Sequence, residues 1–217
     1  MINDTMDSLI DMLDSHTREW LLDRSKALHI FGNLKESVFL RAVERKAKAL
    51  DIPCEVVTKP HHMFYHYTPV VYDTENGSVI PSLSDVADID NAQHKGMSCV
   101  AEAVYLLLKA QGLIHGNTIT IVGRGHSVKG LAEKLIAEDA TVTVAHSKTE
   151  CLLTATQGRD VVIYATPKLD KIISYDTKEL VIDLGGCVEH PNWYQCDYTS
   201  GIGKLTVSVL LNRFAKR

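Results

Sequence analysis

The sequence predicts an α/β protein made of two lobes, the second of which is a doubly wound domain with a parallel sheet. After Ser98, short runs rich in Val and Ile alternate with helical patterns. The runs are nearly continuous in apolar residues, which is typical of parallel strands covered by helices on both faces. The region before Ser98 is less regular, and 217 residues suffice for two small domains.

The first lobe begins with helices and contains one β-α-β unit. Apolar residues recur at mostly helical spacing after Asn3, and good helix formers follow Ser37. The expected elements are, in order, one or two helices over Asn3–Lys26, a strand at Leu28–Phe31, a helix over Ser37–Leu50 and a strand at Cys54–Val57. Three prolines and Asn76-Gly77 predict loops between Lys59 and Asn91, with a short hairpin around residues 68–80.

The second lobe opens with a helix at Cys99–Ala110 that is apolar on one face and connects the two lobes. Strands and helices then alternate, which is the order of a doubly wound sheet. The expected strands are Thr118–Val122, Thr141–Ala145, Val161–Ala165 and Leu180–Leu184, and the expected helices are Val128–Glu138, Lys148–Thr156 and Leu205–Phe214.

Charge and composition exclude several functions. The chain has 23 Lys+Arg against 27 Asp+Glu, a net charge of -4 and no long basic run, which argues against a nucleic-acid partner. No stretch approaches the roughly 20 apolar residues that span a bilayer, and the acidic, amphipathic start is unlike a signal peptide. The 5 widely spaced cysteines fit reduced thiols. We therefore expect a cytoplasmic protein without a membrane partner.

A glycine loop is the most informative motif. Gly123-Arg124-Gly125 follows a predicted strand directly and precedes a predicted helix. There, backbone amides and a helix N-terminus can hold a diphosphate without side chains in the way. Gly130 comes two residues later than in the usual G-x-G-x-x-G pattern. A tight turn that only packs the helix on the strand is the alternative.

The next strand lacks the acid that holds the ribose in sites that prefer NAD. It ends in His146-Ser147-Lys148-Thr149, where an NAD site carries Asp or Glu about 20 residues beyond the glycines. An imidazole, a hydroxyl and an ammonium, with Arg124 expected across the strand ends, suit a 2′-phosphate. This favours NADP, although NAD stays possible. Alternatively, Ser147 caps the next helix.

Four segments resemble the methylenetetrahydrofolate dehydrogenase/cyclohydrolase (FolD) family in order and spacing. They are Val122–Gly125, Thr141–Thr149, Val181–Gly186 and Gly201–Thr206, and the resemblance covers roughly Cys99 to the C-terminus. It implies a folate-binding first lobe, truncated here, a Rossmann-like NADP lobe and a last helix that packs back on the first lobe. The lobes would be residues 1–97 and 98–203, with the returning helix at 204–217. We also expect a homodimer.

The resemblance implies a set of cofactor-binding residues. Gly123, Arg124 and Gly125 would line the phosphates, and His146 and Ser147 the 2′-phosphate. Gly185 and Gly186 would face the nicotinamide side. The further expected residues are His126 and Ser127 in the glycine loop, Ala165, Thr166 and Pro167 beside the nicotinamide, and Thr206.

The first lobe departs from the family pattern. Leu40 and Glu44 occupy the positions of the family's Tyr and Lys, so a phenol is replaced by an aliphatic chain and an ammonium by a carboxylate. A shift to Lys46 turns the side chain about 200° away. Asp90 remains as a candidate pterin contact. Catalytic residues are therefore unknown.

The resemblance implies an NADP-dependent methylenetetrahydrofolate dehydrogenase, an oxidoreductase of one-carbon metabolism that has lost its cyclohydrolase step. The substrate would be a small molecule, a folate in the leading interpretation. Two alternatives stay open: a non-catalytic NAD(P)-binding or regulatory paralogue, and an oxidoreductase that acts on a different small substrate.

We predict no metal. Two weak candidate sites are His61, His62 and His66 in a proline-bounded loop, and Cys187, His190 and Cys196 after the strand Leu180–Leu184. Cys187 is alternatively a reactive thiol near the cofactor or a small, half-buried residue.

Overall fold

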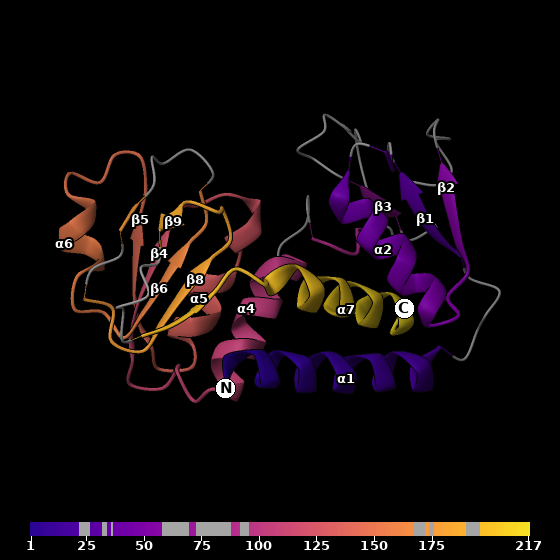
Figure 1. Ribbon diagram of the computed structural model, residues 1–217, viewed down its shortest axis with the longest axis horizontal. Helices are drawn as coiled ribbons and strands as arrows, with labels where there is room; N and C mark the ends of the chain where they lie inside the picture. Colours follow the sequence, from indigo (N-terminus) through magenta and orange to yellow (C-terminus); the bar gives the residue numbers. More distant parts are fainter. Residues whose placement is uncertain are drawn as a thin grey trace. The chain divides into compact units, whose positions relative to one another are not determined.

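The protein folds into two compact units, each built around a parallel sheet (Figure 1). A computed structural model describes residues 1–21, 27–31, 34–35, 37–57, 70–72, 88–91, 96–166, 172–173, 176–189 and 196–217. The five-stranded unit comprises Met1–Asp7 and Val100–Ile202, and the three-stranded unit comprises Ser8–Cys99 and Gly203–Arg217. The predicted two-lobed α/β class is confirmed.

The five-stranded sheet has the spatial order β10-β8-β6-β4-β5, and all its pairs are parallel. Its strands are β4 (Thr118–Val122), β5 (Thr141–Ala145), β6 (Val161–Tyr164), β8 (Leu180–Asp183) and β10 (Asp197–Thr199). Four of them are the predicted strands within one residue, whereas β10 was not expected. A separate parallel pair joins β7 (Ile172–Ile173) to β9 (Val188–Glu189).

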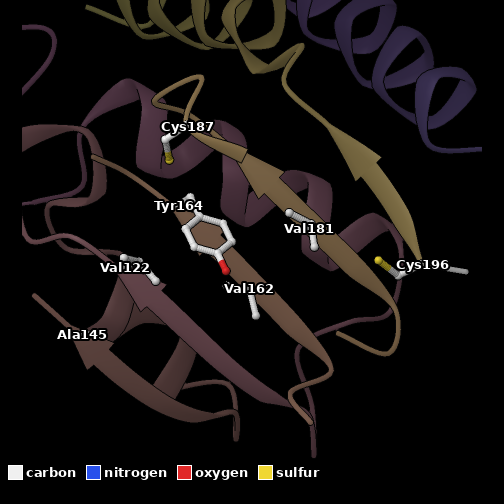
Figure 2. Packing of buried hydrophobic residues seen from close by; sticks show 7 residues of the cluster. All are labelled: Val122, Ala145, Val162, Tyr164, Val181, Cys187 and Cys196. Carbon is white, nitrogen blue, oxygen red and sulfur yellow. The ribbon is translucent and has the colours of Figure 1, made fainter. Parts of the chain in front are cut away.

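The central strands β6 and β8 are buried along their whole length. Figure 2 shows one face of this core, where Val122, Tyr164 and Val181 project from β4, β6 and β8 beside Cys187. Tyr164 lies opposite both Val122 and Asp183 in the strand register. Burial on both faces explains why these strands read as continuous apolar runs.

Two helices of the five-stranded unit begin later than predicted, whereas the helix at Cys99–Ala110 has the predicted bounds. The expected helix at Val128–Glu138 is a 3₁₀ turn, η1 (His126–Val128), followed by α5 (Leu131–Ile136). Gly130 separates them with a φ of +75°, a left-handed conformation that interrupts a helix. The other helices of this unit are most of α4 (Cys99–Ala110) and α6 (Leu152–Thr156). Within the described residues, no helix is both long and apolar enough to cross a membrane.

The three-stranded unit has the sheet order β2-β1-β3, from β1 (Leu28–Phe31), β2 (Cys54–Val57) and β3 (Val70–Tyr72). β3 pairs with β1 in parallel, and the rest of the expected hairpin lies outside the described residues. Its helices are α1 (Ile2–Trp20, from Ser8 onward), α2 (Val38–Ala49) and α7 (Ile202–Ala215, from Gly203 onward). Asn212 of α7 donates hydrogen bonds to Leu13 O and Thr17 Oγ1 of α1, both at 3.3 Å. The last helix thus packs in the first lobe, as expected.

Asp160 joins the starts of two neighbouring strands. The backbone N–H and the hydroxyl of Thr118 both donate to Asp160 Oδ2 at 2.7 Å, and Lys178 Nζ donates to Oδ1 at 3.0 Å. Hydrogen bonds from Thr118, reinforced by the Lys178 ammonium, lower the pKa of Asp160 from 3.8 to about 2. The ionised carboxylate is therefore the form that stabilises the fold.

Replacing Asp160 by Asn is expected to lower the free energy of unfolding at pH 7 by roughly 1–2 kcal/mol, after allowance for solvent screening. Because the folded pKa is depressed, this contribution is complete above about pH 5 and fades as the pH falls from 3.8 toward 2. Urea unfolding of both proteins between pH 7 and pH 3 measures the difference. A difference that stays constant over this range would contradict the ionic origin of the effect.

Candidate functional site

The carboxyl ends of four adjacent strands form one continuous edge of the five-stranded sheet. Their pairing continues past the strands: Gly123 N–H donates to Ala145 O, Ala165 N–H to Val122 O, and Leu184 N–H to Tyr164 O, each at 2.8 Å. The chain runs from β4 outward to β5 and then returns to β6 on the other side of β4. Such a switch point opens a crevice at the carboxyl ends of the strands, where α/β proteins bind ligands.

The two glycines of the loop after β4 have different roles. Gly123 has a φ of +121°, and a Cβ there would lie 2.6 Å from the backbone oxygen of Ala165. Gly125 is exposed, and a Cβ there would meet no atom within 4 Å. Packing therefore explains Gly123 but leaves Gly125 unexplained. The open space above Gly125 is what a closely approaching ligand requires.

The segment after the glycine loop corrects the prediction of an immediate helix. Gly125 precedes η1, and α5 begins only at Leu131, so no α-helix N-terminus follows Gly125 directly. Arg124 is exposed, and it makes no hydrogen bond or ion pair with any part of the chain that the structure describes. His126 and Ser127 lie half-buried in η1.

The chain after β5 forms a tight turn that presents polar groups. The N–H of His146 donates to Thr149 Oγ1 at 2.8 Å, and the N–H of Lys148 donates to His146 Nδ1 at 3.1 Å. Since Nδ1 accepts, the neutral imidazole carries its proton on Nε2, which is left as a donor. Ser147 is exposed, and Cys151 occupies the N-cap of α6, so the alternative that Ser147 caps this helix is wrong.

The ends of β6 and β8 carry the other predicted residues. Ala165 and Thr166 follow β6, whereas Pro167 lies outside the described residues. Gly185 and Gly186 follow β8; Gly186 has a φ of +66°, and a Cβ added to it would meet no atom within 4 Å. A carboxylate at the end of a buried strand is expected to cap or brace that strand end, and the hydrogen bonds of Asp183 confirm this role. Its partners are backbone amides, which leave no trace in the sequence.

Cys187 is unsuited to act as a nucleophile. Its side chain is buried, and burial together with the charge of Asp183 raises the pKa of its thiol to about 11. The alternative of a reactive thiol is therefore wrong, since the thiolate is the reactive form. His190, like the loop histidines His61, His62 and His66, lies outside the described residues.

Residues 98–192 match the family model of the tetrahydrofolate dehydrogenase/cyclohydrolase NAD(P)-binding domain. Over these residues the chain is similar to the NAD(P)-binding domain of the FolD family. The bifunctional protein FolD of Thermosipho melanesiensis is 33% identical over 135 residues, which are 54% of this chain and 50% of that protein. FolD of Pseudothermotoga lettingae is 35% identical over 135 residues, with the same shares covered. The chain thus spans about half the length of the curated relatives it matches.

Solved FolD-type structures share the fold over nearly the whole chain. The 5,10-methylenetetrahydrofolate dehydrogenase of the silkworm Bombyx mori aligns with a TM-score of 0.72 at 18% identity, covering 96% of this chain and 93% of that one. The Trypanosoma brucei N5,N10-methylenetetrahydrofolate dehydrogenase-cyclohydrolase, complexed with NADP cofactor and inhibitor, aligns with a TM-score of 0.69 at 19% identity, covering 99% and 94%. At these identities the likeness concerns the fold alone.

The edge of the FolD-type domain fits a dinucleotide. The backbone at Gly125 and at Gly186 is open to a ligand, since a Cβ at either position would meet no atom within 4 Å. The two glycines follow β4 and β8, which lie on either side of β6. Basic or neutral donor groups follow β5. At about 4.8 Å between strands, the four ends extend over about 14 Å, which suits an elongated ligand. Thr206 is buried in α7 of the other unit, so its assignment to the cofactor stays a prediction.

The first-lobe positions that the FolD resemblance singles out carry no catalytic pair. Leu40 is fully buried, and Lys48 Nζ donates to Glu44 Oε1 at 2.7 Å. Lys46 forms an ion pair with Asp14 of α1 and is thereby held on another face of α2. Asp90 Oδ1 accepts a hydrogen bond of 2.6 Å from the N–H of Cys99 at the start of α4. This contact gives Asp90 a structural role, and its contact with a pterin stays a prediction.

Proposed function

We propose that the chain is an NADP-dependent oxidoreductase of the methylenetetrahydrofolate dehydrogenase type. The observation that supports it most is the tetrahydrofolate dehydrogenase/cyclohydrolase NAD(P)-binding domain at residues 98–192. In the proposed reaction, the methylene carbon of 5,10-methylenetetrahydrofolate gives up a hydride and becomes the methenyl cation. NADP, when bound, accepts that hydride. The task of the chain is to hold the two reactants in position, which can supply much of the rate in such a transfer.

The choice of NADP is supported by the groups at the end of β5. His146, Ser147 and Lys148 follow the strand, and no carboxylate is present before Glu150. Val122 and Ala145 are register partners, so Arg124 and His146 leave neighbouring strand ends. A guanidinium, an imidazole N–H and a hydroxyl match the charge and the acceptors of a 2′-phosphate.

Loss of the cyclohydrolase step is supported by α2. The buried Leu40 offers no polar group, and the Glu44 carboxylate is engaged by Lys48. An activated water would need a group that donates or accepts a proton at this place. Leu40 and Glu44 also favour a second candidate function, which takes one of two forms. The chain is then either a non-catalytic NAD(P)-binding or regulatory protein, or an oxidoreductase that acts on another small substrate.

Cofactor binding and turnover separate these functions. We expect NADPH to raise the melting temperature more than NADH, because only NADPH carries the 2′-phosphate that the groups at the end of β5 match. A ligand at 100 times its Kd adds about 2.7 kcal/mol of stability, so a melting curve detects its binding. Mixing the protein with methylenetetrahydrofolate and NADP should yield NADPH, while methenyltetrahydrofolate should hydrolyse no faster than in buffer. Binding without NADPH formation would favour the second candidate. A melting temperature unaffected by either cofactor would overturn the nucleotide site.

Light scattering tests the expected homodimer.

A further inference from the structure

Asp183, the last residue of β8, is a buried carboxylate that holds the following loop from inside. Only 2% of its surface is exposed. Its Oδ1 accepts hydrogen bonds from the N–H of Gly185 at 3.1 Å and of Cys187 at 3.2 Å, and its Oδ2 accepts one from the N–H of Val188 at 2.8 Å. Three of the four N–H groups from Gly185 to Val188 therefore converge on one side chain.

Two side chains complete this shell. Tyr198 Oη of β10 donates to Oδ2 at 3.4 Å, and Cys187 Sγ lies 3.7 Å from Oδ1. A buried carboxylate is costly unless hydrogen bonds satisfy it, and here both oxygens are used. An amide could not replace it, because the NH₂ of Asn would face an N–H donor. The loop thus requires a side chain with two acceptor oxygens at this position.

The loop held by Asp183 shapes the end of β8 beside the end of β6. Asp183 pairs in register with Tyr164, whose carbonyl accepts from the N–H of Leu184. The bond to Val188 fixes the first residue of β9. Between these anchors, Gly186 turns outward with a φ of +66°, and it is exposed with open space where a Cβ would stand.

We propose that Asp183 is a positioning residue for the nicotinamide half of the cofactor. It does not touch the ligand. It fixes the Gly185–Gly186 turn so that the exposed backbone of Gly186 stays open beside the strand edge. This role rests on the proposed function. It concerns only the end of the strand edge at β8, because β8 and β5, where the 2′-phosphate is expected, lie at opposite ends of the four strands. A loosened turn should weaken contacts to the nicotinamide and leave contacts to the 2′-phosphate unchanged.

The test compares two ligands that share the adenosine end. NADPH carries the nicotinamide, whereas adenosine 2′,5′-bisphosphate carries the 2′-phosphate without it. For Asp183→Asn we expect calorimetry to show about a tenfold loss of NADPH affinity, while the affinity for the bisphosphate stays within about twofold of wild type. Equal losses for both ligands would show a general structural role, and unchanged NADPH affinity would exclude any role. Either result overturns the proposal.

A second variant decides the question if Asp183→Asn does not fold. Gly186→Ala leaves the carboxylate in place but adds a methyl group to the turn and strains its φ of +66°. This substitution should again lower the affinity for NADPH and leave the affinity for the bisphosphate unchanged. If the variant bound NADPH as tightly as the wild type, the assigned position of the turn would be refuted. A wild-type protein that binds neither ligand would overturn the proposed function, and this role with it. A wild-type protein that binds both, with Asp183→Asn identical to it, would overturn only the role of Asp183.

Discussion

Replacing Gly123 by Ala is expected to lower the free energy of unfolding by about 2–4 kcal/mol and to abolish NADPH binding. Two causes add. The φ of +121° is a conformation that residues with a Cβ rarely adopt, and the new methyl group would lie 2.6 Å from the backbone oxygen of Ala165. Backbone cannot swing aside as a flexible side chain does. The loops after β4 and β6 would therefore separate, and both belong to the proposed cofactor edge.

Gly125→Ala is the matched control. Its φ of -76° suits any residue, and the added methyl group meets no atom within 4 Å. This variant should unfold within about 0.5 kcal/mol of wild type. Its NADPH affinity should fall, because the added methyl group occupies the open space that the ligand is proposed to approach. Urea unfolding and calorimetry on both variants provide the comparison. Similar unfolding curves for the two would contradict the packing role of Gly123.

The strands of the cofactor edge could be predicted because burial leaves a clear record in the sequence. Val161 to Tyr164 and Leu180 to Asp183 are buried on both faces, so nearly every position is apolar. Parallel pairing then brings the residues after each strand to the same edge, which is why the predicted residues after β4, β5, β6 and β8 lie together. The short strands β9 and β10 were missed, since two or three residues carry no periodicity.

The start of the helix after the glycine loop could not be predicted from periodicity. Val128, Leu131 and Leu135 are all buried at helical spacing, and this pattern continues through the 3₁₀ turn and across Gly130. Only the backbone conformation of Gly130 shows where α5 begins. The acid at the end of β8 indicates a brace for the strand end, but it does not show which groups Asp183 binds. Its partners are backbone N–H groups, whose positions depend on the fold and not on the residue types.

The exposed residues beside the end of β5 should determine which cofactor binds. Ser147→Asp is expected to weaken NADPH binding by about 30-fold, since a carboxylate about 5 Å from a 2′-phosphate costs roughly 2 kcal/mol even when screened. NADH binding should be retained or improve, because an acid at this place accepts hydrogen bonds from the ribose hydroxyls. Titration of both cofactors at one ionic strength measures the reversal.

Arg124→Ala and Ser147→Ala measure separately what the guanidinium charge and the hydroxyl group contribute to NADPH affinity. Both residues are exposed, so these substitutions should leave the free energy of unfolding within about 0.5 kcal/mol of wild type. Arg124→Ala should lower NADPH affinity about tenfold and leave NADH affinity unchanged, because only NADPH has the phosphate that a guanidinium would bind. Ser147→Ala should have a smaller effect of the same sign. If Arg124→Ala instead weakened both cofactors equally, Arg124 would contact the diphosphate that they share, and the NADP preference would have to come from His146 and the turn after β5 alone.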